Sequence, residues 1–504
     1  MSRRSLTSRT LGGFLWVSSG SAAHAVLSTI IMMVQARFLT PTEFGIVGAA
    51  MIVIGFSQIF SQLGIGPAIV QRRELSAGHI RVGFTVSFIL GCLVGVLFYF
   101  LASALAVFFR MDDLAPVIKV LALIFPITGL SVTGQSLLQR AMRFKRLALI
   151  DIFSYALFYG GLGILLAVTG WGVWALVFAQ IGQAACTALI MLGMHHKELG
   201  FRFKASEMGE LLNYGLGFSL ARIANYAATQ ADNLVVGRWM GPAALGIYGR
   251  AYQFLMMPAT QLGTVADKVL FPVMSAVQQD RPRLARAYIT GVALIAMMTM
   301  PISGVLIVLA PEVIYVLLGK AWMAVAPPFQ VLAVALVFRT SYKMSDSLAR
   351  ATGAVYRRAW RQWVYAAAVF SGAWIGHFWG LSAVAAGVGL AILLNFLLMF
   401  HLTESIVKIS WRELGIIHLR HLVVACVVSA AALAVKTALI PLGAHPIVIL
   451  AASLVAAGLV FLGLWFGWRG IFGDEGRWAH ELVKRYASKP LNRLGIGRTR
   501  EPSA

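Results

Sequence analysis

The sequence is a succession of long apolar runs, and this feature decides the fold class. Each run is about 20 residues or longer, enough for a helix that crosses the ~30 Å hydrocarbon core of a bilayer. Only 12% of the residues are charged, against roughly 25% in soluble globular chains. A soluble multidomain protein is therefore excluded, and we expect an all-α polytopic membrane protein with about fourteen transmembrane helices. The predicted spans are 11–35, 44–67, 82–109, 114–138, 147–168, 171–194, 211–236, 245–270, 287–310, 313–338, 360–378, 381–400, 419–440 and 446–468.

Prolines and glycines make the boundary between the ninth and tenth spans ambiguous. Pro311, Gly319 and the pair Pro327–Pro328 interrupt the apolar pattern there. Proline removes a backbone donor from a helix and clashes with the preceding turn, so it often ends one. The tenth span either covers 313–338 or starts as late as Pro327 and runs to about Ser347.

Basic residues between the spans predict the orientation. With the N-terminus in the cytoplasm, 33 of the 42 Lys and Arg residues lie in inner segments, and the imbalance repeats at every second loop. The positive-inside rule then predicts that both termini are cytoplasmic. The net charge of +23 is explained by this placement, so nucleic acid binding has no support. Ser2-Arg3-Arg4 imitates a twin-arginine signal, but we interpret 11–35 as the first span because its apolar character continues to Val34.

The three cysteines do not suggest a site. Cys92, Cys186 and Cys426 all lie inside apolar runs. Their spacing offers neither a disulfide framework nor a metal cluster. No cofactor is expected.

The chain contains an internal duplication. Residues 37–50 align with residues 238–251, and Arg, Pro, Gly, Ile, Gly and Ala coincide in the same order. An even-numbered repeat keeps its topology, so two six-span repeats are expected to be related by a pseudo-two-fold axis along the membrane normal. Two such lobes enclose a cleft that can open to either face by rocking, which is the geometry of alternating access. The predicted parts are an N-terminal six-helix lobe at 1–200, a C-terminal six-helix lobe at 201–410, two additional transmembrane helices at 411–468 and a basic cytoplasmic tail at 469–504.

The duplicated segment resembles a known family. The pattern Arg-x-[Leu/Met]-x-Pro-x-x-[Phe/Leu]-Gly from Arg37, its repetition from Arg238, and the preceding Gln230-Ala231-Asp232 are similar to the polysaccharide flippases of the multidrug/oligosaccharidyl-lipid/polysaccharide exporter superfamily. The resemblance implies a bacterial inner-membrane protein that moves undecaprenyl-diphosphate-linked oligosaccharide from the cytoplasmic to the periplasmic leaflet, for exopolysaccharide, capsule or lipopolysaccharide O-antigen assembly. It implies membrane lipids as neighbours and leaves glycan polymerase and export machinery as candidate partners. By analogy with the peptidoglycan-precursor flippase, spans 419–440 and 446–468 would form a groove for the lipid tail.

A polar stripe in the seventh span is the first candidate for substrate binding. Arginine suits a diphosphate because its planar fork makes paired charge-assisted hydrogen bonds. Arg222 lies near the middle of the bilayer when ~1.5 Å per residue is counted from Leu211. We predict that Arg222 binds the diphosphate; the alternative is a buried arginine bonded to carbonyls or to an acid on another span. The stripe recurs every three or four residues and comprises Arg222, Asn225, Tyr226, Thr229, Asp232 and Asn233.

Four further arginines are weaker substrate-binding candidates. Arg37 and Arg238 end the first and seventh spans, and they either form a cationic outer vestibule or fix their turns by pairing with Glu43 or capping helix C-termini. Arg250 has no charged counterpart in the first repeat. Arg339 shares a helix face with Lys343 and Asp346, and we expect Asp346 to neutralise Lys343.

Asp232 is the candidate coupling site for a proton or sodium ion. Desolvation raises the pKa of an intramembrane acid, so that it can load and release a proton. The alternative is an acid at the helix end that pairs with Arg238. Pro258 in the eighth span predicts a kink that could serve as a gating bend.

Two other functions compete with this prediction. A cation-coupled multidrug antiporter of the same superfamily would hold acids in its cavity, whereas this chain places arginines on its polar faces. A membrane glycan polymerase or glycosyltransferase is less favoured. The pair Asp112–Asp113 is typical of such enzymes, but every outer loop is roughly a dozen residues or fewer and we interpret the pair as helix capping. The chain is therefore not expected to be an enzyme.

Overall fold

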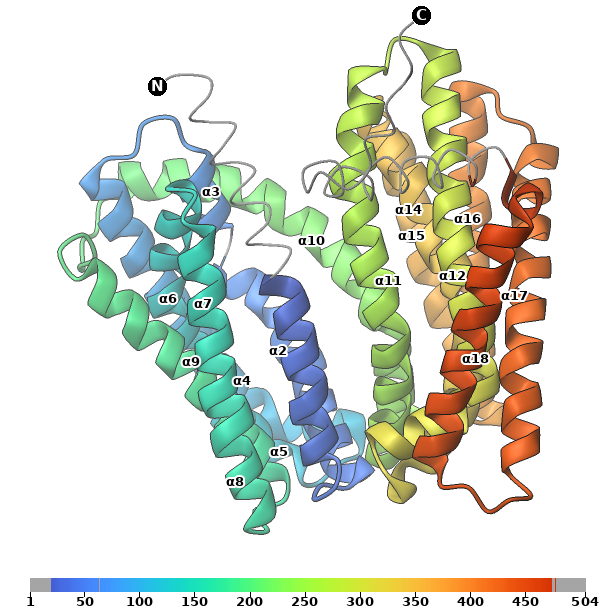
Figure 1. The fold of residues 1–504 in the computed structure, drawn as a ribbon. Coiled ribbons are helices and arrows are strands. Elements are labelled where there is room, and N and C mark those ends of the chain that lie inside the picture. Colours follow the sequence, from blue (N-terminus) through green and yellow to red (C-terminus); the bar gives the residue numbers. More distant parts are fainter. Residues whose placement is uncertain (1–19, 63, 474–475, 477–504) are drawn as a thin grey trace, which may run out of the picture. The chain divides into compact units, whose positions relative to one another are not determined.

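The computed structural model describes residues 20–62, 64–473 and 476. Within helices it leaves the side chains of 212–222, 224–225, 262, 264–269 and 469 undescribed. Every regular element of the described part is a helix (Figure 1). The all-α prediction is confirmed.

The helices follow one another with short connections, in this order: Gly20–Gln35, α2 (Pro41–Gln62), α3 (Ile65–Gln71), α4 (Ala77–Phe109), α5 (Leu114–Leu121), α6 (Ile124–Arg140), α7 (Phe144–Ser154), the π-helix η1 (Tyr155–Leu162), α8 (Gly163–Val168), α9 (Val173–His195), α10 (Ala205–Met240), α11 (Pro242–Ala276), α12 (Arg281–Leu317), the 3₁₀ turn η2 (Lys320–Val325), α13 (Ala326–Val334), α14 (Leu336–Ala351), α15 (Val355–Gly376), the 3₁₀ turn η3 (His377–Trp379), α16 (Leu381–Val407), α17 (Trp411–Leu439), α18 (Pro446–Gly467) and the 3₁₀ turn η4 (Arg469–Phe472).

Several helices can cross a bilayer by length and composition. Nine helices in the described part meet this condition, and a tenth does so if the pair Lys320–Val334 and Leu336–Ala351, bent by 42°, is one span. The helix Gly20–Gln35 is apolar but shorter. The predicted spans at 211–236, 245–270 and 360–378 fall on the more polar helices α10, α11 and α15. A polytopic membrane protein is thus established, and the exact count of fourteen stays a prediction.

The ninth and tenth spans differ from the favoured prediction. Helix α12 does not end before Pro311 but continues to Leu317, and the next long helical stretch begins at Ala326. Pro311 cannot donate to the carbonyl of Ile307, four residues earlier. The side chain of Gln330 donates to that carbonyl instead, at 2.9 Å from Nε2, so the helix continues through the proline. The range 313–338 is wrong, and the later start near Pro327 agrees with the structure.

Contacts divide the chain into two compact units. Unit 1 comprises residues 1–257, 317–329 and 362–391, and unit 2 comprises 258–316, 330–361 and 392–504. The boundaries cut through α11 at Pro258 and through α15 and α16. Helix α11 continues through Pro258 and through Pro272. The two six-helix lobes stay a prediction from the duplication.

Unit 1 is built on close helix crossings. A Cβ added to Gly91 of α4 would lie 2.5 Å from the carbonyl oxygen of Phe125 in α6, and one on Gly129 would lie 2.5 Å from that of Ser87. Small residues at such crossings let two backbones pack closely, which is how helices associate in lipid. Figure 1 shows α4, α6, α7 and α9 packed together in this unit.

Two large apolar cores stand out among the described residues of unit 2. One core surrounds the buried side chains of Tyr288, Met344 and Phe400, from α12, α14 and α16. The other joins α12 to the last two long helices, and Phe472 of η4 packs into it against Phe461 and Trp465. The helices α17 and α18 lie side by side (Figure 1). Unit 2 therefore holds the two additional helices against α12.

Candidate substrate and coupling site

The polar stripe of the seventh span lies on one long helix, α10. The side chains of Arg222 and Asn225, two members of the stripe, lie outside the described residues. The predicted roles of both therefore stay predictions. The C-terminal part of the stripe, from Tyr226 onward, lies within the described residues.

Tyr226 ties α10 to α2 within unit 1. Its hydroxyl donates to the carbonyl oxygen of Ile52 at 2.8 Å. Gly55 faces the same hydroxyl so closely that a Cβ there would lie 2.5 Å from it. One turn further on, the hydroxyl of Thr229 donates to the carbonyl of Tyr226 at 3.1 Å. The second predicted span of the first repeat and the first predicted span of the second repeat are thus joined by a side-chain to backbone hydrogen bond.

Asp232 is buried and held by a tyrosine. Its side chain is 1% exposed, and Oδ2 accepts a hydrogen bond from the Tyr248 hydroxyl at 2.8 Å. Tyr248 is itself buried and stacks on Tyr252, with ring centroids 6.2 Å apart. The predicted alternative, a pair with Arg238, is wrong, because the Arg238 guanidinium lies over the rings of Phe108 and Trp239. A desolvated carboxyl that accepts from a neutral hydroxyl is suited to binding a proton or a small cation.

Arg250 is enclosed by neutral groups from the first repeat. Its guanidinium lies 4.2 Å from the ring centroid of Phe44 in α2, and Nη1 contacts the Met32 sulfur at 3.7 Å. The same nitrogen donates to the side chain of Gln253. Tyr155 and Tyr159 of η1 are close enough to interact with its charge. These partners leave the positive charge without a neutralising carboxylate in its described surroundings.

Arg37 and Arg238 have different surroundings, although the duplication relates them. Arg37 is exposed and its Nη1 lies beside Gly319. Arg238 Nη1 is buried with no hydrogen-bond partner among the described residues. Glu43, the expected partner of Arg37, instead accepts hydrogen bonds from the backbone N–H and the hydroxyl of Thr40, at 2.6 and 3.0 Å, and so caps α2.

Arg339 belongs to unit 2, whereas Arg37, Arg238 and Arg250 belong to unit 1. It is 6% exposed and lies 5.6 Å from the ring centroid of Tyr342. The expected neutralisation of Lys343 by Asp346 is wrong. Asp346 pairs with Arg350 at 3.1 Å and with Arg358, because these two arginines reach the carboxylate from the next turn and from α15.

An apolar cavity of about 580 Å³ lies within unit 2. Its walls come from α12, from the α13–α14 pair and from α17, and almost all of its lining is apolar. Helices α12 and α17 approach closely beside it, since a Cβ on Gly304 would come within 3.0 Å of the Ser429 hydroxyl. An apolar lining of this kind fits hydrocarbon and not a charged headgroup, which would lose its hydration there.

The sequence pattern did not predict the two contacts that the Lys436 ammonium makes with α12. Lys436 of α17 pairs with Glu312 of α12 at 3.0 Å and donates to the carbonyl of Val308 at 2.8 Å. Both residues were visible in the sequence, but only the fold brings positions 124 residues apart together.

Asp113 takes the N-cap position of α5 without a side-chain capping hydrogen bond, so the capping interpretation of that residue is wrong.

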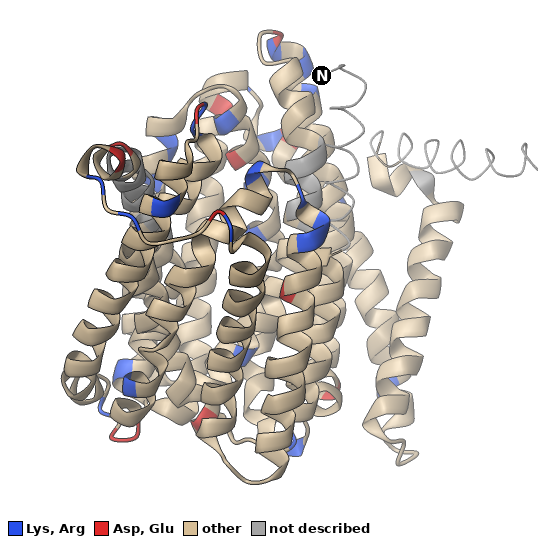
Figure 2. Cartoon of the chain, turned by 90° about the vertical axis from the view of Figure 1, so that its left-hand side faces the viewer, with Lys and Arg blue, Asp and Glu red and all other residues tan. Residues whose placement is uncertain are grey.

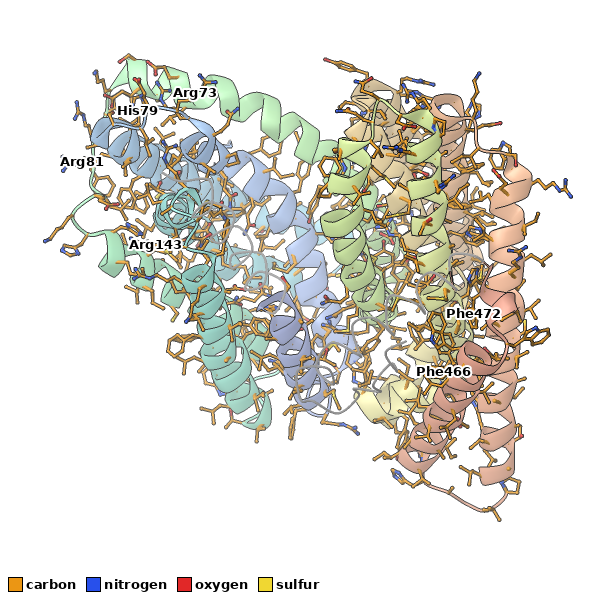
Figure 3. The ribbon with its side chains drawn as sticks, turned by 45° about the horizontal axis from the view of Figure 1, so that its top comes forward. Arg73, His79, Arg81, Arg143, Phe466 and Phe472 are labelled. Carbon is orange, nitrogen blue, oxygen red and sulfur yellow. The ribbon has the colours of Figure 1, made fainter. Side chains whose placement is uncertain are left out.

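Basic residues gather at the helix ends. Figure 2 shows that most Lys and Arg of the described ribbon lie near the ends of their helices. In unit 1, Arg73, His79, Arg81 and Arg143 lie at these ends (Figure 3). Glu210, near the start of α10, accepts a hydrogen bond from Arg72 and contacts His79 at 3.4 Å. Arg72 and then His79 hold the pKa of the Glu210 carboxyl below its ordinary value.

Comparison of the fold with solved structures defines the class. The chain is similar to the lipid II flippase MurJ in an inward closed conformation, with a TM-score of 0.74, 15% identity, and coverage of 93% of this chain and 100% of that one. It is also similar to an inward-facing multidrug resistance MATE family transporter of the MOP superfamily, with a TM-score of 0.61, 19% identity, and coverage of 77% and 96%. Both likenesses establish the fold, which is that of an all-helical polytopic membrane protein.

The chain belongs to the polysaccharide biosynthesis protein family, whose model matches residues 34–327. It is 23% identical to the teichuronic acid biosynthesis protein TuaB of Bacillus subtilis over 81% of this chain and 84% of that protein. It is 24% identical to the lipopolysaccharide biosynthesis protein WzxC of Escherichia coli, over 67% and 68%. The succinoglycan biosynthesis transport protein ExoT of Rhizobium meliloti is 25% identical, over 61% and 62%. The family predicted from the duplicated motif is thereby confirmed.

Proposed function

We propose that this protein moves undecaprenyl-diphosphate-linked oligosaccharide from the cytoplasmic to the periplasmic leaflet of the bacterial inner membrane, by alternating access. The family match over 34–327 carries the proposal. Relatives named for teichuronic acid, lipopolysaccharide and succinoglycan biosynthesis support a glycan cargo. The transport serves exopolysaccharide, capsule or O-antigen assembly, with glycan polymerase and export machinery as downstream partners. Both termini lie in the cytoplasm, as the basic loops indicate.

Arginines in the predicted cleft bind the diphosphate. Arg222 is the first choice because of its depth in α10. Arg250 is a second candidate for the diphosphate. It lies about 12 Å along α11 from Pro242, the first residue of that helix, and its described partners are neutral. Arg339 is the candidate from unit 2, and Arg37 and Arg238 are the candidates at the outer end. Asn225, Tyr226 and Thr229 contact the sugars.

The lipid tail stays in an apolar environment while the headgroup crosses. The cavity beside α17 supports this division of labour, because its lining is almost entirely apolar. Movement of an isoprenoid from the bilayer into this cavity costs little, because lipid tails are as apolar as its lining. Helix α17 of the two additional helices thus receives the hydrocarbon, together with α12 and the α13–α14 pair, and the arginines receive the phosphates.

Asp232 couples the movement to an ion. Its burial and its hydrogen bond from Tyr248 support reversible proton or sodium binding. In the empty carrier the acid would load an ion from the outer side and release it inside. The resulting cycle would return the empty carrier to the state that accepts cytoplasmic substrate.

Reconstitution tests the proposal. Proteoliposomes containing fluorescent undecaprenyl-diphosphate oligosaccharide should show protein-dependent exchange between leaflets, measured by quenching of the outer leaflet. Arg222→Ala should lower the rate at least about tenfold, corresponding to about 1.4 kcal/mol, and Arg222→Lys should restore part of it. Arg143→Ala, at a helix end outside the cleft, is the matched control. Wild-type vesicles that leave the lipid in place but export a cationic dye would replace the proposal with a drug antiporter.

Asp232→Asn tests the coupling separately. The variant should exchange substrate at equilibrium but lose the acceleration that an imposed proton or sodium gradient gives to the wild type. Tyr248→Phe removes the hydroxyl from Asp232 and should shift the pH at which acceleration is half-maximal. An unchanged response of Asp232→Asn to both gradients would refute the assignment of this residue.

A further inference from the structure

The first turns of α2 and α11 cross in direct backbone contact within unit 1. A Cβ added to Gly45 would lie less than 3.0 Å from the carbonyl oxygen of Pro242, and one added to Gly246 would lie less than 3.0 Å from that of Pro41. Real Cβ atoms essentially never come so close to another atom. Because the obstacle is backbone, no side-chain rotation can relieve the overlap. Both positions accept only glycine while the helices are in contact.

The contact is reciprocal, and it uses the duplicated motif. Each proline begins its helix, a position that suits proline because the N–H it lacks would be unpaired anyway. Each glycine follows four residues later, one turn along, and meets the proline carbonyl of the other repeat. Neighbouring glycines on the same helices are not constrained in this way. A Cβ on Gly48 would make an ordinary contact with Leu245 at 3.7 Å, and one on Gly249 would meet nothing within 4 Å.

A second segment of the later repeat reaches the same end of the first repeat. It is the 3₁₀ turn η2 between α12 and α13, which belongs to unit 1. Trp322 of η2 is completely buried and donates from Nε1 to the carbonyl of Ala36 at 2.9 Å. Its ring meets that of Phe44 edge to face, with centroids 5.3 Å apart. Because Phe44 directly precedes Gly45, its contact with Trp322 places the indole beside the crossing.

These contacts have the properties required of a seal that opens. Backbones in contact leave no room for water, so the crossing is tight. The atoms involved offer only weak C–H···O interactions and dispersion, worth about 0.5–1 kcal/mol for each C–H···O contact. Trp322 adds one hydrogen bond and one aromatic contact. At the crossing itself the backbones meet without interlocking side chains, and beside it the Arg250 guanidinium of α11 lies 4.2 Å from the ring centroid of Phe44 in α2. Separation of the helices therefore breaks weak backbone contacts together with this cation–π contact and the contacts of Trp322.

We propose that the crossing of α2 and α11 at Gly45 and Gly246, clamped by Trp322, closes the outer side of the substrate path. The two glycines are positioning residues for alternating access: they do not bind substrate, but they let the repeats meet. The inference rests on the proposed function for its direction, since the prediction that both termini are cytoplasmic puts this end on the periplasmic side. It also assigns a physical role to the motif shared by the two repeats.

Thiol accessibility tests the seal without requiring substrate. In a chain lacking the three native cysteines, Leu245→Cys puts a thiol at a position that is 3% exposed beside the crossing. Adding Gly45→Ala should force the helices apart and raise labelling by an impermeant maleimide from the outer side about tenfold, equivalent to ~1.4 kcal/mol of population shift. Gly249→Ala should leave labelling unchanged, since its Cβ enters open space.

A structural control separates sealing from packing. Gly129→Ala disturbs another backbone crossing, within the first repeat, where the added Cβ also lies less than 3.0 Å from a carbonyl oxygen, so it should lower the unfolding temperature without raising outer labelling. Trp322→Phe, which loses the bond to Ala36, should raise labelling by a smaller factor than Gly45→Ala. In the flipping assay, Gly246→Ala should lower the maximal rate and leave substrate affinity unchanged.

The outcomes are distinguishable. Equal labelling of the Gly45→Ala and Gly249→Ala chains, or an equal rise in Gly129→Ala, would overturn the seal. If Gly45→Ala does not fold, unchanged labelling of Trp322→Phe would overturn it instead. Increased labelling in Gly45→Ala and Trp322→Phe, combined with a wild type that moves no lipid-linked oligosaccharide, would support the seal and reject the proposed function.

Discussion

The ion pair between Glu312 and Lys436 should stabilise the attachment of α17 to α12. The two side chains are 10% and 15% exposed, and Lys436 reaches both the carboxylate and the Val308 carbonyl. Removal of one partner of a buried ion pair leaves an uncompensated charge and costs about 3–5 kcal/mol. Because an amide in place of the carboxylate still accepts a hydrogen bond, Glu312→Gln should lower the free energy of unfolding by about 3 kcal/mol, the low end of that range.

Equilibrium unfolding in mixed micelles measures this change. The double variant Glu312→Met with Lys436→Met should recover most of the loss, since replacement of both charges by apolar groups of similar volume is often neutral. The exposed pair Arg283–Asp280 is the matched control, and Asp280→Asn should cost less than ~1 kcal/mol. A Glu312→Gln protein as stable as the wild type, or a double variant no better than the single one, would refute the reasoning.

Three further changes have defined outcomes. Tyr226→Phe should lower the free energy of unfolding by about 1 kcal/mol, measured by thermal denaturation, because one hydrogen bond to the α2 backbone is lost. Gly304→Ala should lower the midpoint of unfolding more than Ser429→Ala does, because the added methyl overlaps the Ser429 hydroxyl. The double variant should be intermediate, since Ser429→Ala removes that hydroxyl. The contact of Arg72 with Glu210 lowers the pKa of the carboxyl, so it is stabilising above an unfolded pKa of about 4.3 and is lost as pH falls through the folded value. Proteolysis before α10 should therefore increase on acidification, and Arg72→Ala should show the increase at a higher pH.

The fold was predictable because bilayer physics leaves few choices. Apolar runs of sufficient length fix the helices, and most predicted spans coincide with helices of the structure. The error at the ninth span arose from proline chemistry. The sequence shows that Pro311 leaves the carbonyl of Ile307 without its helical donor. Only the fold shows that the Gln330 side chain donates to this carbonyl instead.

The site was less predictable, because side-chain partners come from distant parts of the chain. The periodicity of α10 placed Tyr226 and Asp232 on one helix, yet nothing in it indicated that Tyr248 would donate to Asp232. Local spacing favoured Lys343 as the partner of Asp346, whereas Arg358 from the next helix took that place. The duplicated motif identified the family before its physical role, a helix crossing, was visible.

The π-helical stretch Tyr155–Leu162 makes the fifth span unusually sensitive to changes in length. A wide turn accommodates about one residue more than an α-turn does, so deleting a single residue there would return the segment to ordinary winding. Residues beyond the deletion would keep their faces, whereas those between the wide turn and the deletion would rotate by about 100° about the helix axis. Tyr159 would then turn away from Arg250. Chimaeras that exchange this span between relatives must therefore conserve its residue count before its composition.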